Sequence, residues 1–185
     1  MQKETVVDHL NGQQWSNKSI FYLVVATTLA QGLHMVEHAT QVYQHAILGY
    51  TLATSHGLVF FLDFEWNHFV FDIFVYLSLL TVIFFKAGIY NELKTSKFRN
   101  LRTNGYRELF IAMFAVGLIT QGYHGAEHVI RVYQFTTTVC APCLGFLGNY
   151  IDNVYLHAGF NTIVYALTTI AMIGLGFFNR GPLKR

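Results

Sequence analysis

Hydrophobic residues along this chain are gathered into four long runs that are separated by more polar segments. The runs cover residues 19–44, 65–85, 108–134 and 152–178. A helix of about 20 apolar residues crosses the roughly 30 Å of hydrocarbon in a bilayer, and each run reaches that length. The runs also lack the polar outer face that a soluble helix bundle needs. We therefore predict an all-α membrane protein with four transmembrane helices.

The composition agrees with lipid as the surrounding solvent. Of the 185 residues, 53% are hydrophobic and only 12% are charged, whereas soluble domains average about 25% charged residues. The four runs use most of the chain, so we expect no separate soluble domain. The sequence has no dense basic patch, and nucleic acid is therefore not an expected partner.

The positive charges favour one orientation in the membrane. Most of the 12 Lys and Arg residues lie in the central connection or near the two termini, whereas Arg131 lies inside the third run. By the positive-inside tendency, both termini and the central connection are cytoplasmic, and the segments 45–62 and 135–151 face outside. We predict a multi-pass protein of the cell membrane, with a larger membrane complex or a homo-oligomer as its protein partners. The chain divides into a cytoplasmic segment 1–18, a hairpin 19–90, a basic linker 91–107, a second hairpin 108–178 and a basic tail 179–185.

The two hairpins repeat each other in sequence. The pattern Gln-Gly-x-His-x-x-Glu-His-x-x-x-Val-Tyr-Gln begins at Gln31 and again at Gln121. Because two spans separate the copies, both have the same membrane orientation. We predict a tandem duplication with a pseudo-twofold axis along the membrane normal, folded as a four-helix bundle. In the second helix of each hairpin, Asp63, His68, Phe71, Asp72 and Tyr76 correspond to Asp152, His157, Phe160, Asn161 and Tyr165.

Polar residues form one stripe on the first helix of each hairpin. At about 100° per residue, His34, Glu37 and His38 fall on one side of their helix. An ionisable side chain that faces lipid costs about 2.5 kcal/mol or more, so such a stripe turns towards protein. Counting along each helix places these residues in the outer third of the membrane, level with His68 and Asp72. Each hairpin then offers a His-Glu-His set together with the His and Asp or Asn of its own second helix.

These side chains predict a transition-metal site. Imidazole and carboxylate groups favour Zn, Cu or Fe, and histidines at positions i and i+4 of a helix can bind one cation. The candidate ligands are His34, Glu37, His38, His68, Asp72, His124, Glu127, His128 and His157. Glu37 and Glu127 are also the candidate catalytic residues, because a carboxylate there could complete the coordination, bridge two metals or act as a base towards metal-bound water. Two mononuclear sites and one dinuclear site on the pseudo-twofold axis both fit this pattern.

The function predicted from the pattern is that of a membrane metal-binding protein, an oxidoreductase or an accessory subunit of one, with its site in the outer half of the bilayer. The alternatives are a haem carrier with two histidine ligands, a metal-handling protein, and a structural subunit with a polar core. Haem is less favoured, because a bis-histidine haem does not need the glutamate beside each second histidine. Transport is less favoured, because the spans are mostly apolar on the cytoplasmic side of Gln31 and Gln121.

The string His-x-x-Glu-His, at His34–His38 and at His124–His128, resembles the inverted zinc-protease motif. That resemblance implies two zinc-binding histidines and a glutamate as general base. A protease needs one such motif, whereas this chain has two. The resemblance covers this string alone, and we do not carry the protease activity over.

Two smaller signals lie in and beside the segment 135–151. Cys140 and Cys143 have the spacing of a redox motif but lack a strand and helix around them, so we expect a disulfide that staples the segment. Arg131 stands where the first copy has Gln41, and we expect it to pair with Glu127 or Asp152. Because Arg131 breaks the symmetry, the two halves are expected to differ, one active and one supporting.

Overall fold

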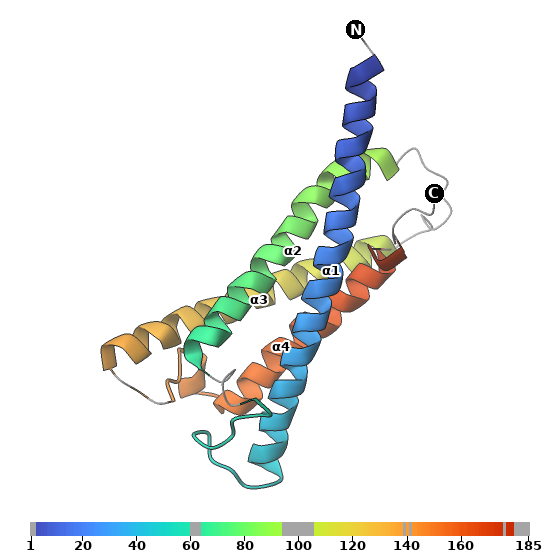
Figure 1. Cartoon of the computed structure of the whole chain (residues 1–185). Helices are drawn as coiled ribbons and strands as arrows, with labels where there is room; N and C mark the ends of the chain where they lie inside the picture. The colour runs from blue at the N-terminus through green and yellow to red at the C-terminus, as the bar shows by residue number, and fades with distance from the viewer. Residues whose placement is uncertain are drawn as a thin grey trace.

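Four long helices make up the computed structural model, which describes residues 3–59, 64–93, 106–138, 140, 142–175 and 177–179. The helices are α1 (Lys3–Ala46), α2 (Glu65–Leu93), α3 (Tyr106–Thr138) and α4 (Asn153–Gly174), with the short 3₁₀ helices η3 (Leu147–Asn149) and η4 (Phe177–Asn179). The first loop (described residues 47–59 and 64) joins α1 to α2, and the second loop (described residues 140 and 142–152) joins α3 to α4. Figure 1 shows both loops at the lower end of the molecule, opposite the start of α1.

All four long helices contain a stretch that is long and apolar enough to cross a membrane. These stretches are Ser19–Ala46, Glu65–Phe84, Glu108–Thr138 and Asn153–Gly174. The predicted all-helical fold and the predicted number of spans are confirmed, as expected for a multi-pass membrane protein. Asp63, most of the linker 91–107 and most of the tail 179–185 lie outside the described residues.

The helix boundaries differ from the predicted ones in both halves of the chain. α1 begins at Lys3 and α2 continues to Leu93, so both helices extend beyond the predicted runs 19–44 and 65–85. α3 continues to Thr138 instead of ending at residue 134, because the hydroxyls of threonines 136–138 donate to backbone carbonyls one turn earlier at 2.7–3.0 Å. These polar residues are thereby accommodated inside a helix. α4 begins after Asp152, whose carboxylate caps the helix by accepting the N–H of Val154 at 2.9 Å. It ends at Gly174 instead of residue 178.

An apolar core fills the half of the bundle that lies away from the two loops. Its buried members are Ile20, Val24, Val75, Leu79, Val82, Phe114, Ala171 and Met172, contributed by all four helices. The outer surface is apolar as well, with Leu33, Phe84 and Ile119 each more than 70% exposed. Apolar side chains on both the inside and the outside of a helix bundle suit a lipid environment. The buried histidines of the spans lie in the other half of the interior, near the loops.

Close contacts between helices decide which side chains can meet. α1 packs against α4, and α3 packs against both α2 and α4. A Cβ atom on Gly32 of α1 would lie 3.2 Å from the hydroxyl of Tyr165 on α4, and one on Gly122 of α3 would lie 3.2 Å from the ring of Tyr76 on α2. The helix backbone therefore comes close to an aromatic ring of the other hairpin at both glycines. Residues near these glycines face across the hairpins.

Candidate metal centre

Pairs of histidines one helical turn apart form the centre of the site. Residues i and i+4 share one helix face, and neither α1 nor α3 contains a proline that would break this register. The Nε2 atoms of His34 and His38 lie 3.1 Å apart on α1, and those of His124 and His128 lie 3.2 Å apart on α3. All four residues are buried. Each helix thus directs two imidazole nitrogens to one place in the interior.

A third histidine reaches each pair from the next helix along the chain. His68 of α2 joins His34 and His38 to form the first triad. The second triad consists of His124, His128 and His157, the last from α4. Within each triad, one ring nitrogen per residue lies within 4.8 Å of the others, a spacing that allows three imidazoles to bind one metal ion. The structure thus brings together all the histidines that the sequence pattern selects, in two groups of three.

Hydrogen bonds at the far side of two rings orient them towards the triads. Nδ1 of His157 lies 2.8 Å from the carbonyl oxygen of Asn153, and Nδ1 of His68 lies 3.4 Å from that of Phe64. A carbonyl oxygen only accepts, so Nδ1 carries the hydrogen and Nε2 keeps its lone pair. Such a partner on the second ring nitrogen is typical of metal-binding histidine.

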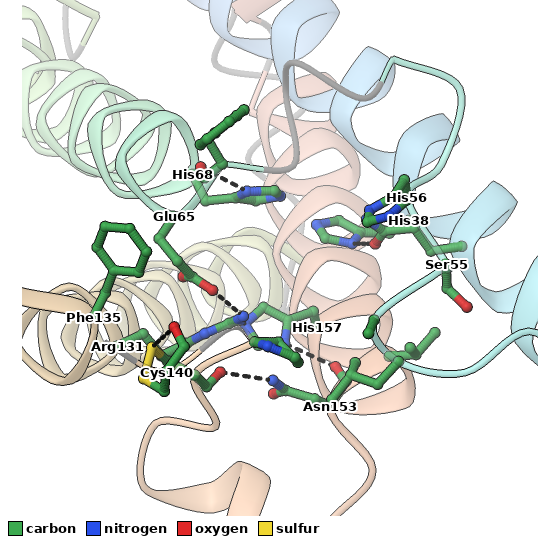
Figure 2. A pocket seen from close by; sticks show the side chains of 17 residues that line it. His38, Ser55, His56, Glu65, His68, Arg131, Phe135, Cys140, Asn153 and His157 are labelled. Carbon is green, nitrogen blue, oxygen red and sulfur yellow. Dashed lines mark hydrogen bonds and ion pairs between the residues drawn. A yellow bond between two sulfur atoms is a disulfide. The ribbon is translucent and has the colours of Figure 1, made fainter. Parts of the chain in front are cut away.

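The two triads adjoin each other in the interior. The rings of His68 and His128 stack with 5.4 Å between their centroids and 8° between their planes. The rings of His38 and His157 lie 6.1 Å apart. Figure 2 shows His38, His68 and His157 around one shared space. The six imidazoles therefore form a single cluster with two adjacent sets of potential ligands.

Asp72 lies with the second triad, although it belongs to the first hairpin. Its Oδ2 atom is 3.2 Å from Nε2 of His128, and its Oδ1 atom is 3.5 Å from Nδ1 of His124. Gln121 donates to Oδ1 at 2.9 Å and fixes the carboxylate in this position. The expectation that Asp72 serves the histidines of its own hairpin is therefore wrong. Because α2 packs against α3, a carboxylate one turn after His68 faces α3.

Asn161 occupies the corresponding position on α4, and its amide bonds to other groups. Its Oδ1 atom accepts from Nε2 of Gln31 on α1 at 2.8 Å. Its Nδ2 atom donates to the backbone carbonyl of His157 at 3.0 Å. Asn161 is completely buried, and both of its polar groups are used by these bonds. Through these bonds it joins α1 to α4.

Glu37 and Glu127 anchor the loops and belong to neither triad. The two carboxylate oxygens of Glu37 accept the N–H groups of Leu58 and Val59 in the first loop, each at 3.1 Å. Glu127 accepts the N–H groups of residues 146–147 in the second loop, the shortest at 2.8 Å. A carboxylate that receives two N–H groups directs its lone pairs to them. The geometry thus supports a loop-positioning role for both glutamates, in place of the ligand or base role that the pattern suggested.

Replacing Glu37 with glutamine is expected to lower the free energy of unfolding by about 1–3 kcal/mol, because one loop N–H loses its charged acceptor. The metal content per chain is expected to stay at the wild-type level, since Glu37 lies outside both triads. Unfolding in detergent and metal analysis on the same preparation check both parts. Glu127→Gln is the matched variant in the second hairpin. A loss of metal with unchanged stability would show instead that Glu37 is a ligand.

Arg131 and Glu65 complete the charged groups of the site. The Arg131 guanidinium on α3 pairs with the Glu65 carboxylate at the start of α2, and its Nη1 atom donates to Nε2 of His157 at 2.7 Å. The expected pairing of Arg131 with Glu127 or Asp152 is wrong, because Glu127 is bound to the second loop and Asp152 caps α4. The sequence pattern did not select Glu65. The signal that could have found it is an ionisable residue at the first position of a span.

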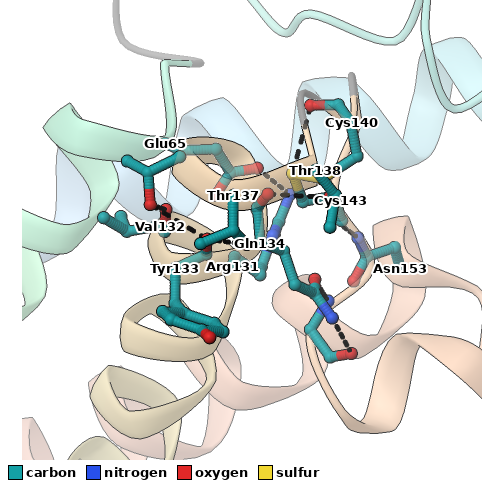
Figure 3. Close-up of a disulfide and its surroundings, with 12 residues drawn as sticks. Glu65, Arg131, Val132, Tyr133, Gln134, Thr137, Thr138, Cys140, Cys143 and Asn153 are labelled. Atoms are coloured by element: carbon teal, nitrogen blue, oxygen red, sulfur yellow. Dashed lines mark hydrogen bonds and ion pairs between the residues drawn. A yellow bond between two sulfur atoms is a disulfide. The ribbon is translucent and has the colours of Figure 1, made fainter.

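A pocket of 260 Å³ lies between the loops and the histidine cluster. His38, His68 and His157 line its inner side, and residues of both loops line its outer side (Figure 2). Cys140 and Cys143 form a disulfide in this outer wall, as Figure 3 shows, which confirms the predicted staple. A small molecule in the pocket would therefore be in contact with imidazoles of both triads.

Comparison of the chain with known protein families, with curated proteins and with solved structures gives no match. Four apolar helices and two buried histidine triads are compatible with a membrane protein that binds metal.

Proposed function

We propose that this chain is an integral membrane metalloprotein that binds transition-metal ions in its two histidine triads and acts as an oxidoreductase or as a subunit of one. The observation that carries the proposal is the convergence of three buried imidazoles, twice, in one cluster. Ionisable residues within membrane spans are costly, and they generally pair or serve a functional site. Imidazole is a ligand that Zn, Cu and Fe share, whereas Ca²⁺ and Mg²⁺ prefer oxygen.

A buried carboxylate oxygen that lies against an imidazole nitrogen without a hydrogen bond favours a metal site over a polar core that only joins helices. Asp72 is completely buried, and its Oδ2 atom makes no hydrogen bond within the described part of the chain. A buried polar group without a partner costs about 1–3 kcal/mol, and a purely structural core gains nothing from it. A cation bound beside Asp72, His124 and His128 would bind this oxygen together with the neighbouring imidazole nitrogens.

The haem alternative fits this geometry less well. Two histidines that ligate a haem point their nitrogens at the iron from opposite faces of the macrocycle. In this cluster the rings of His68 and His128 are stacked on each other, with centroids 5.4 Å apart. Stacked rings present their faces to each other, and they leave no room for a macrocycle between the triads.

Equivalent contacts in the two hairpins support a tandem duplication with a pseudo-twofold axis along the membrane normal. Gln31 bonds to Asn161 across the interface between α1 and α4, and Gln121 bonds to Asp72 across the interface between α3 and α2. Each hairpin also has a glutamate that accepts two N–H groups of its own loop. A repeated unit explains why the glutamine contact between hairpins and the glutamate contact with the loop each occur twice.

The orientation of the protein completes the proposal. The distribution of Lys and Arg supports cytoplasmic termini in the cell membrane and a site in the outer half of the bilayer. The apolar core then lies between the site and the cytoplasm. This core favours a resident metal over a transported one. The large exposed apolar surface suits lipid together with other subunits of a membrane complex or further copies of the chain.

The pocket favours an enzymatic role over a purely structural metal site. Its volume is 260 Å³, and His38, His68 and His157 line it directly. A structural metal site is closed by protein ligands, whereas a catalytic site keeps an open position. A transition metal bound there would supply Lewis-acid or one-electron chemistry.

Metal analysis and an optical spectrum of the purified full-length protein test this proposal. We expect two metal ions per chain in the wild type, and about one in His34→Ala and in His124→Ala. His45→Ala is the matched control, because His45 lies 3.0 Å from Asp152 and belongs to neither triad. A Soret band would establish haem instead. If the purified protein binds neither metal nor haem, the histidine cluster serves only to join the helices.

A further inference from the structure

The two triads differ in what surrounds them, although their histidines are arranged alike. Asp72 contacts His124 and His128 of the second triad. Asn161, at the corresponding place on α4, has both polar groups bound to Gln31 and to a backbone carbonyl. The second triad therefore has a carboxylate as an additional donor. In the described part of the chain, the groups that could bind a metal in the first triad are its three imidazoles.

The two triads also differ in how many of their histidines line the pocket. Two members of the first triad, His38 and His68, line it. His157 is the one member of the second triad that lines it, and Nε2 of His157 accepts from the Arg131 guanidinium at 2.7 Å. A guanidinium stays protonated and cannot bind a metal. It therefore occupies the lone pair of the one imidazole of the second triad that lines the pocket, whereas the first triad presents two imidazoles, His38 and His68, to the pocket.

From these differences we infer that the first triad is the open site, where a small anionic ligand from the pocket binds a metal ion, and that the second triad with Asp72 is the closed site. This inference rests on the proposed function, since both sites need a metal. The fixed ligands of the closed site are His124, His128 and Asp72. Nε2 of His157 has a single lone pair, which accepts from Arg131, so His157 joins the closed site only when that bond is broken.

Charge and size define the ligand class. Three neutral imidazoles leave the charge of a divalent ion at the first triad uncompensated, whereas the Asp72 carboxylate cancels part of it at the second. The Glu65 carboxylate, which also lines the pocket, is paired with the Arg131 guanidinium. An anion is therefore attracted more strongly to the first triad. The volume of 260 Å³ is below the roughly 300–1,000 Å³ of pockets for drug-sized molecules, so the ligand is small.

Cobalt(II) binding with azide as the probe tests the inference on the full-length protein in detergent. Metal is first removed with a chelator, and cobalt is added while the visible spectrum and the bound metal are recorded. We expect two equivalents of cobalt in the wild type and a change of the spectrum when azide is added. His68→Ala and His34→Ala are expected to keep one equivalent and to lose the azide response.

Asp72→Asn is the matched variant for the closed site. It replaces the carboxylate beside the second triad with an amide, the group that Asn161 has at the corresponding position of α4. We expect its cobalt affinity at one of the two sites to fall at least about tenfold, with the azide response retained. The equivalent of cobalt that each variant keeps shows that it is folded. An azide response that survives in His68→Ala, or that disappears in Asp72→Asn, would overturn the assignment.

Two further outcomes separate this inference from the proposed function. Binding of two cobalt ions with no effect of azide on any variant would overturn the open site and leave the metalloprotein intact. A wild-type protein that binds no cobalt, zinc or copper would overturn both.

Discussion

Arg131→Gln is expected to lower the free energy of unfolding by about 3–5 kcal/mol. The Arg131 and Glu65 side chains are 11% and 14% exposed, so water solvates their ion pair only slightly. Removal of one partner of a buried pair leaves the other charge without compensation, which is more costly than loss of the pair as a whole. Arg131 also bonds to His157, so the change loosens contacts from α3 to both α2 and α4. Unfolding in mixed detergent micelles measures the effect.

The double variant Arg131→Gln with Glu65→Gln is the control for this expectation. It removes both charges, and its stability is expected to lie within about 1–2 kcal/mol of the wild type. Gln41 stands at the corresponding position of α1, where it bonds to His38 at 2.7 Å, so glutamine is compatible with this place in the helix. Equal losses of stability in the single and double variants would mean that the uncompensated charge of Glu65 is not the cause of the loss.

The spans were predictable because lipid imposes strict conditions on a chain. A segment that crosses the bilayer must satisfy its backbone hydrogen bonds internally, which makes it a helix, and must be apolar over about 20 residues. Both conditions are visible in a sequence. The end of α3 was less visible, because threonines 136–138 indicate a loop by their polarity. Their hydroxyls bond to the preceding turn, and the helix continues.

The histidine triads were also visible in the sequence, through helical spacing and depth. His34 and His38 share a face of α1, and His68 lies at the same level on the next helix. The partner of Asp72 was not visible, because it depends on which helices pack side by side. Spacing along one helix carries no information about its neighbours. Contacts such as that of Gly122 with Tyr76 decide it, and they bring α2 to α3.

The two glutamates illustrate a second limit of the pattern. Glu37 lies about 100° around the helix from His38, at the edge of the polar stripe. From that position its carboxylate can reach either the imidazoles or the loop that follows the helix. The N–H groups of Leu58 and Val59 are available to it only because the first loop folds back over the end of α1. A loop conformation of this kind is not encoded in helical periodicity.

The first loop depends on Gly57, and Gly57→Ala is expected to lower the free energy of unfolding by at least about 3 kcal/mol. Gly57 has φ = +72°, a conformation that costs other residues about 1–3 kcal/mol. A Cβ atom would also overlap the carboxylate of Glu37, whose displacement breaks its bonds to the loop. Gly57 has little freedom to move, because Gln44 bonds to both its N–H and its carbonyl at 2.9 Å.

Gly49→Ala separates the two contributions, because Gly49 has nearly the same φ, +71°, and no atom within 4 Å of the added Cβ. It is expected to cost only the backbone strain, about 1 kcal/mol. Gly145→Ala should behave like Gly57→Ala, since its Cβ would lie 2.5 Å from Oε2 of Glu127. If all three variants lost the same stability, strain alone would explain the result. A larger loss at Gly57 and Gly145 would show that both loops are held in place by a glutamate beneath a glycine.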